Sequence, residues 1–129
     1  MSAFDYCFST LGCSELSLHE TADLAQRHGI AHVELRTLSG TVDLIPALTV
    51  EFATPSRFAA FLAERGLKVA ALNTSIRLFG STDLSAVEPF IDWAEAADIS
   101  YLRIFDGGKQ VGLDEMTLAA RLLDDWRAL

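Results

Sequence analysis

Five polar side chains stand in short segments that otherwise have the composition of buried β-strands: Glu34, Arg36, Asn73, Ser75 and Arg103. Successive strand residues point to opposite faces, so Glu34 and Arg36 share one face of their strand and its apolar residues share the other. Strands buried on both faces are normally apolar throughout. The pattern therefore favours a closed barrel whose polar interior serves as a site over a flat sheet that helices cover on both faces.

Two interpretations of these charges are open. Glu34 and Arg103 are consistent with a structural ion pair as well as with a binding site, because burying either charge alone is costly. Arg36 and Asp106 stand at C-terminal strand ends, where α/β proteins build their sites, and for them binding is the better interpretation. Arginine binds phosphate or carboxylate groups through two parallel hydrogen bonds.

Four segments have the length and the β-branched or aromatic content of strands. Each is followed by a helical pattern, and such alternation predicts βαβ units with a parallel sheet in one α/β domain of 129 residues. We expect four parallel strands in sequential order, with Val33, Leu35, Leu102 and Ile104 facing the helices. The expected strands are Tyr6–Thr10, His32–Arg36, Lys68–Thr74 and Tyr101–Asp106.

Helix boundaries are marked by capping residues. The first helix is expected from a capping box at Ser17–Glu20 to Gly29, and the second from Thr54-Pro55 to Gly66. A third is expected near a second capping box at 85–88, and a fourth near position 114. The segments Thr37–Ala53 and Ile76–Leu84 are expected to be long loops, either site walls or surface decoration.

Composition limits the partners. The chain carries a net charge of −8, which argues against nucleic acid because phosphate contacts depend on Lys and Arg. No apolar run is long enough to cross a membrane, and the first residues do not form a secretory signal. Cys7 and Cys13 lack a C-x-x-C spacing, so we expect a cytoplasmic protein without a disulfide framework. No histidine spacing indicates a metal cluster.

Several motifs resemble the first half of the xylose-isomerase-like TIM barrels, a superfamily of sugar phosphate isomerases and epimerases. The segment 9–13 and the helix after it are similar to that group's opening. His32–Arg36 is similar to its second strand, a Gly-hydrophobic-Glu-hydrophobic-Arg pattern. Tyr101–Gly108 is similar to its fourth strand, an aromatic-hydrophobic-Arg-hydrophobic-Phe-x-Gly run. The resemblance covers almost the whole chain and implies half of a (β/α)₈ barrel.

This resemblance implies a substrate-binding wall but no metal ligands. In the superfamily, a divalent metal (Mg²⁺, Mn²⁺ or Zn²⁺) is held by residues at the ends of strands five to eight, and none has a matching position here. The residues that match the wall lie on three segments. They are Glu34, Arg36, Asn73, Ser75, Arg77, Arg103, Asp106, Gly107 and Gly108.

Three functions are open. The first is isomerisation or epimerisation of a small sugar or hydroxy-ketone acid by metal-assisted proton transfer in the complete form. The second is a nuclease like the apurinic-site endonucleases, which the charge disfavours. The third is a non-catalytic half-barrel or assembly module. A closed barrel takes about 250 residues, so we expect either a longer parent chain, truncated here after the fourth βα unit, or a homodimer. The longer parent is favoured because the final helical pattern has no stop signal.

Overall fold

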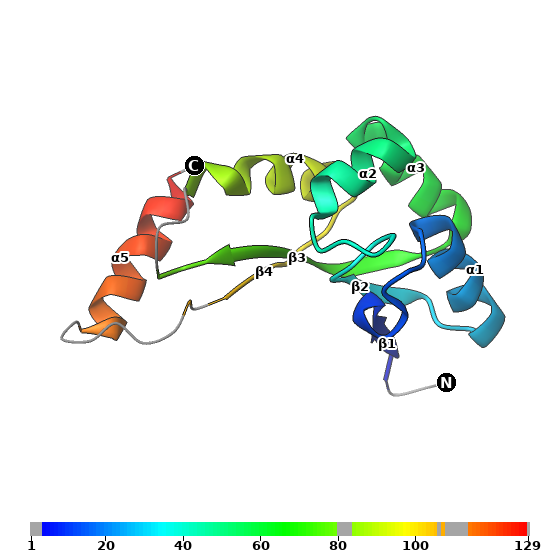
Figure 1. The fold of residues 1–129 in the computed structure, drawn as a ribbon, viewed down its shortest axis with the longest axis horizontal. Coiled ribbons are helices and arrows are strands. Elements are labelled where there is room, and N and C mark those ends of the chain that lie inside the picture. Colours follow the sequence, from blue (N-terminus) through cyan, green and yellow to red (C-terminus); the bar gives the residue numbers. More distant parts are fainter. Residues whose placement is uncertain (1–3, 80–83, 106, 108–113, 129) are drawn as a thin grey trace.

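The structure is a computed structural model that describes residues 4–79, 84–105, 107 and 114–128. Strands and helices alternate along the chain, with one additional helix between the second and third strands (Figure 1). Two short 3₁₀ helices, Thr10–Cys13 and Leu84–Val87, complete the described elements. The others are β1 (Cys7–Ser9), α1 (Leu18–His28), β2 (His32–Leu35), α2 (Leu44–Phe52), α3 (Pro55–Arg65), β3 (Lys68–Arg77), α4 (Glu88–Ala96), β4 (Leu102–Phe105) and α5 (Glu115–Arg127).

The strands form one parallel sheet in the order β1-β2-β3-β4. This confirms the predicted α/β fold with sequential parallel strands. Among the described residues the sheet is open, with β1 and β4 at its two edges. Helices α1 to α4 lie along one face, whereas α5 lies beyond the ends of β3 and β4 (Figure 1). Within the same ranges, the opposite face has no helical layer.

The hydrophobic core lies between the sheet and the helices α1 to α4. Val33, Leu35 and Leu72 are fully buried there, against residues such as Leu48 and Phe58. Leu102 and Ile104 are partly buried against the same cluster. The predicted apolar strand face is therefore the helix-facing one, and the polar residues of the strands point to the open face.

Local capping sets the ends of α1 and α3. The predicted capping box forms between Ser17 and Glu20, and α1 ends at Gly29 in the left-handed conformation. Thr54 caps α3 by accepting a hydrogen bond from the amide of Arg57. These helix ends could be predicted from the sequence because each cap involves residues only three or four positions apart.

The start of α1 receives a second cap from α2. The Glu51 carboxylate accepts hydrogen bonds from the amides of Leu18 (3.0 Å) and His19 (2.9 Å) and contacts the His19 ring through Nδ1. That ring lies against Phe52 and Phe61. One carboxylate thus joins α2 to the positive end of α1, where a negative charge is favourable.

Three sequence-based expectations are wrong. The expected loop 37–53 contains α2, whose Leu44, Leu48 and Phe52 are buried at helical spacing; Pro46 lies in the first turn, where its missing amide costs little. The expected capping box at 85–88 does not cap α4, because a 3₁₀ turn leads directly into that helix and its N-cap residue is Val87. Strand β3 also continues past Thr74 to Arg77, so Ser75 and Arg77 belong to a strand.

None of the helices within the described ranges combines the length and the apolar composition that a membrane span requires.

Candidate functional site

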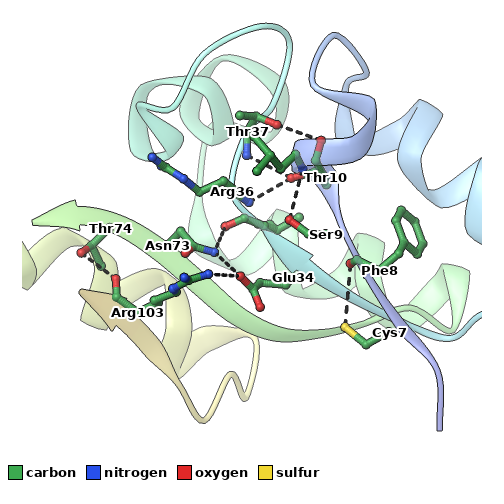
Figure 2. Close-up of polar contacts among 12 residues, drawn as sticks. Cys7, Phe8, Ser9, Thr10, Glu34, Arg36, Thr37, Asn73, Thr74 and Arg103 are labelled. Carbon is green, nitrogen blue, oxygen red and sulfur yellow. Dashed lines mark hydrogen bonds and ion pairs between the residues drawn. The ribbon is translucent and has the colours of Figure 1, made fainter. Parts of the chain in front are cut away.

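Glu34 is the centre of a polar cluster on the open face of the sheet (Figure 2). Its Oε1 accepts hydrogen bonds from Asn73 Nδ2 at 2.8 Å and from Arg103 Nη1 at 3.2 Å. The three residues come from β2, β3 and β4. The Asn73 side chain is fully buried, whereas 29% of the Glu34 side chain and 58% of the Arg103 side chain are exposed. The outer two members are therefore accessible to a ligand.

The backbone at the end of β2 is fixed by Thr10. The Thr10 hydroxyl oxygen accepts hydrogen bonds from the amides of Arg36 (2.9 Å) and Thr37 (3.0 Å). The Thr37 hydroxyl in turn donates to the carbonyl oxygen of Thr10 at 2.9 Å. Thr10 is completely buried. These bonds hold the point at which Arg36 leaves the strand, so they position its side chain (Figure 2).

The guanidinium of Arg36 is held by Ser75. Arg36 Nη1 donates to Ser75 Oγ at 2.9 Å. Ser75 has a φ of 60°, a left-handed conformation that is rare for a residue with a side chain. The pairing of β3 with β4 is irregular in this region, between Asn73 and Arg77. This bulge turns the Ser75 hydroxyl toward Arg36.

Hydrogen bonds of Thr74 stabilise the same bulge. Thr74 Oγ1 donates to the carbonyl oxygen of Arg103 at 2.9 Å and accepts from the amide of Ile76 at 3.1 Å. Left-handed backbone at a residue other than glycine costs about 1–3 kcal/mol and clusters at functional sites. The surrounding bonds of Thr74 and Ser75 provide the stabilisation that such a conformation requires.

The ring of Phe105 contacts both arginines of the face. The guanidinium carbon of Arg36 is 5.3 Å from the ring centroid and that of Arg103 is 5.9 Å away. Both distances suit cation–π contacts. Arg103 has Glu34 as its counter-ion, but Arg36 forms no ion pair with a carboxylate of the described residues. Arg36 therefore presents a positive charge held by neutral groups.

Five of the predicted site residues form two hydrogen-bonded groups, and the remaining ones do not belong to either group. Glu34, Asn73 and Arg103 form one group, and Arg36 with Ser75 forms the other. Arg77 is exposed at the end of β3, in register with Phe105. Asp106 and Gly108 lie outside the described residues.

Gly107, one of the predicted wall residues, lies where the chain passes close to its own backbone. It has a φ of 86°, and a Cβ placed there would overlap the carbonyl oxygen of Phe79. This position therefore needs glycine. The neighbour that it approaches is the chain's own backbone.

Thr10 and Phe105 also belong to this face, although the sequence did not single them out as site residues. Thr10 acts through hydrogen bonds to residues 26 and 27 positions further along the chain, for which the sequence contains no local signal. Phe105 follows from strand alternation, because Arg103 and Phe105 are two positions apart and share a face. Its ring contacts depend on the bulge in β3, which alternation does not reveal.

A metal ion does not fit the described part of this face. Its described residues bring together no group of three or more His, Cys, Asp or Glu side chains. The carboxylate of Glu34 already accepts hydrogen bonds from Asn73 and Arg103. Burial raises the pKa of the nearby Cys7 thiol, and the Glu34 charge raises it further, so Cys7 is a poor source of thiolate.

A hollow of about 770 Å³ opens at the opposite end of the sheet, between α3 and α4. Six alanines line it, together with residues that include His32, Lys68 and Tyr101. Sites in parallel α/β sheets form at the carboxyl ends of the strands. The open polar face is therefore the better candidate, although it is not enclosed.

Comparison with protein-family models, curated proteins and solved structures finds no match for this chain. The resemblance to xylose-isomerase-like barrels stays a prediction from motifs.

Proposed function

We propose that the open polar face binds a small sugar phosphate or hydroxy-ketone acid, as the substrate-binding wall of an isomerase or epimerase of the xylose-isomerase-like kind. The observation that carries the proposal is the environment of Arg36. Its guanidinium is fixed by Ser75 and the Phe105 ring without an ion-pair partner among the described residues. An anionic group of a ligand would supply that partner.

The second group of residues suits the rest of such a ligand. The Glu34 carboxylate can accept hydrogen bonds from sugar hydroxyls, and Arg103 can donate to hydroxyl or carbonyl oxygens. Both are partly exposed; Glu34 precedes Arg36 by two residues, and Arg103, on β4, shares the Phe105 ring with Arg36. The face therefore offers a cation for the charged end of a substrate and a donor–acceptor pair for its hydroxylated end.

The proposed reaction moves a proton next to a carbonyl group, and in the family that the motifs resemble a divalent metal would supply the polarisation of the substrate oxygens. The described residues do not supply ligands for that metal. Their part in the proposal is to bind and orient the substrate. We propose a cytoplasmic setting, since Cys7 and Cys13 are both unpaired.

Calorimetric titration with a ketopentose phosphate, the unphosphorylated ketopentose and inorganic phosphate tests this proposal. Arg36→Ala removes the bidentate contact, worth about 2 kcal/mol, so affinity for the sugar phosphate should fall about 30-fold. Affinity for the unphosphorylated sugar should change little. The matched control is Arg57→Ala, because Arg57 is an exposed arginine on α3 in the helical layer.

Two results would contradict the proposal. One is the absence of binding to the unmodified protein at millimolar sugar phosphate. The other is an equal effect of Arg36→Ala and Arg57→Ala, which would show that only overall charge matters.

A further inference from the structure

One side-chain atom of the polar face is buried without a hydrogen-bond partner. Asn73 is completely buried, and its Oδ1 has no partner among the described residues. Its Nδ2, in contrast, donates both of its hydrogens, to Glu34 Oε1 at 2.8 Å and to the carbonyl oxygen of Leu35 at 3.1 Å. Buried polar atoms are nearly always hydrogen-bonded in folded proteins, so this exception needs an explanation. A ligand that supplies the missing donor is one.

The orientation of the Asn73 amide follows from its neighbours. An ionised carboxylate and a backbone carbonyl accept hydrogen bonds and do not donate them, so the amide nitrogen must face Glu34 and Leu35. A rotated amide would place oxygen against oxygen on both sides and would lose both hydrogen bonds. Oδ1 therefore faces away from these two groups, as an acceptor that the described sheet does not use.

Arg103 lies across this amide. Asn73 and Arg103 are level with each other on neighbouring strands, and Glu34 is on the strand at the other side of Asn73. The Arg103 side chain therefore passes Asn73 on its way to Glu34 Oε1 (Figure 2). Its hydrogen bond to Glu34 is long, at 3.2 Å, and 58% of the Arg103 side chain is exposed. Such an exposed ion pair contributes little stability, so Arg103 can turn away at small cost.

Once Arg103 turns away, two acceptors lie close together. The nitrogen and oxygen of one amide group are about 2.2 Å apart. Because Asn73 Nδ2 is 2.8 Å from Glu34 Oε1, the two acceptor oxygens, Asn73 Oδ1 and Glu34 Oε1, are at most about 5 Å apart. Neighbouring hydroxyls of a sugar can each donate to one of them, whereas a ligand with a single hydroxyl can satisfy only one.

We propose that Asn73 Oδ1 accepts a hydrogen bond from a ligand hydroxyl, and that Arg103 uncovers it by turning from Glu34 toward the ligand. The ligand class is then a ketose phosphate with two neighbouring hydroxyls, one on Asn73 and the next on Glu34, rather than an acid with one hydroxyl. This inference rests on the proposed function, which it extends to the hydroxylated end of the substrate. Asn73 is a specificity-determining residue in this role, because a buried acceptor rejects a ligand that lacks the donor.

The chain offers a direct probe, because Asn73 is its only asparagine. In protein labelled with asparagine that carries carbon-13 at Cγ, the Asn73 amide carbon gives a single NMR signal, which moves downfield when Oδ1 accepts a hydrogen bond. A ketopentose phosphate should move this signal downfield, and inorganic phosphate should not. Among the monodeoxy analogues of the ketopentose phosphate, one should bind about tenfold more weakly and leave the signal in place.

Arg103→Ala tests the cover in the absence of any ligand. Removing this side chain lets water reach Oδ1, so the Asn73 Cγ signal of the free protein should move downfield. Arg57→Ala, the exposed arginine of α3, is the matched control and should leave the signal unchanged. An unmoved signal in Arg103→Ala would overturn the proposal, because turning Arg103 away would then give a ligand no route to Oδ1.

Failure of this inference can be distinguished from failure of the proposed function. If the sugar phosphate binds, and Arg36→Ala weakens it, while the Asn73 signal stays in place, the proposed function holds and Oδ1 is not the acceptor. If the sugar phosphate does not bind to the unmodified protein, both are overturned. Equal movement of the signal with inorganic phosphate and with the sugar phosphate would also overturn the inference, since the change would then come from charge and not from a hydroxyl.

Discussion

Replacing Arg103 and Asn73 in turn by alanine separates the two interpretations of the polar cluster, binding and structure. Both residues donate to the same oxygen, Glu34 Oε1. Their burial differs completely, since Asn73 is fully buried and the Arg103 side chain is 58% exposed. The free energy of unfolding should therefore respond very differently to the two substitutions.

The expected magnitudes follow from that burial. Asn73 Nδ2 also donates to the carbonyl oxygen of Leu35 at 3.1 Å, so Asn73→Ala removes two hydrogen bonds inside the sheet. Each contributes about 1 kcal/mol, which predicts a loss of about 2 kcal/mol. Asn73 Oδ1 has no partner among the described residues, so its removal costs nothing further. An exposed ion pair contributes about 0.2–1 kcal/mol, which is the limit expected for Arg103→Ala.

Urea unfolding followed by circular dichroism measures both values, at one fixed chain concentration because self-association would add to stability. Arg57→Ala is again the matched exposed arginine. In parallel titrations, Arg103→Ala should lower sugar phosphate affinity despite its small effect on stability. A stability loss for Arg103→Ala equal to that for Asn73→Ala would refute the reasoning and make the Glu34–Arg103 pair a structural one.

Three further predictions concern the scaffold around this face. Glu51→Ala should lower the free energy of unfolding by about 2–3 kcal/mol in urea unfolding, because two amides of α1 lose a carboxylate, whereas Glu64→Ala on the exposed side of α3 should cost under about 0.5 kcal/mol. Gly107→Ala should lower the melting temperature, because the new Cβ overlaps the carbonyl oxygen of Phe79; an unchanged value in calorimetry would contradict this. Hydrogen bonds from the side chain and amide of Thr117 lower the pKa of Asp114 below its ordinary 3.8. The contribution of Asp114 to the stability of α5 is therefore present above pH 3.8 and is lost as the pH falls through the lowered pKa. The amide proton resonance of Thr117 should titrate with a midpoint below 3.8.

Much of the fold could be predicted because its signals are local. The four strands were found from short β-branched and aromatic segments, and the caps of α1 and α3 from residues a few positions apart. Helix α2 was missed because Pro46 and the absence of a side-chain cap at Asp43 hide its start. Its buried residues at 44, 48 and 52 follow helical spacing, so that signal was available.

The candidate site was only partly predictable. Alternation in β2 and β4 placed Glu34 and Arg103 on one face, and they form an ion pair there. The contact of Arg36 with Ser75 depends on a bulge, and a bulge shifts every later residue of β3 relative to its neighbours. The sequence between Asn73 and Arg77 does not reveal where the two extra residues of β3 fall, because tertiary contacts such as those of Thr74 determine their place.

The two arginines of the face illustrate why burial alone does not identify a binding residue. Arg103 is the more exposed, yet Glu34 neutralises its charge at 3.2 Å. Arg36 is half-buried and is held by a neutral hydroxyl and an aromatic ring. A half-buried cation whose described contacts are with neutral groups is unfavourable, and so is the left-handed backbone of Ser75 that helps to hold it. In a chain with a net charge of −8, long-range attraction does not bring an anion to this face. Any anion bound there must gain its free energy from short contacts, and the fixed guanidinium of Arg36 reduces the entropy that those contacts lose.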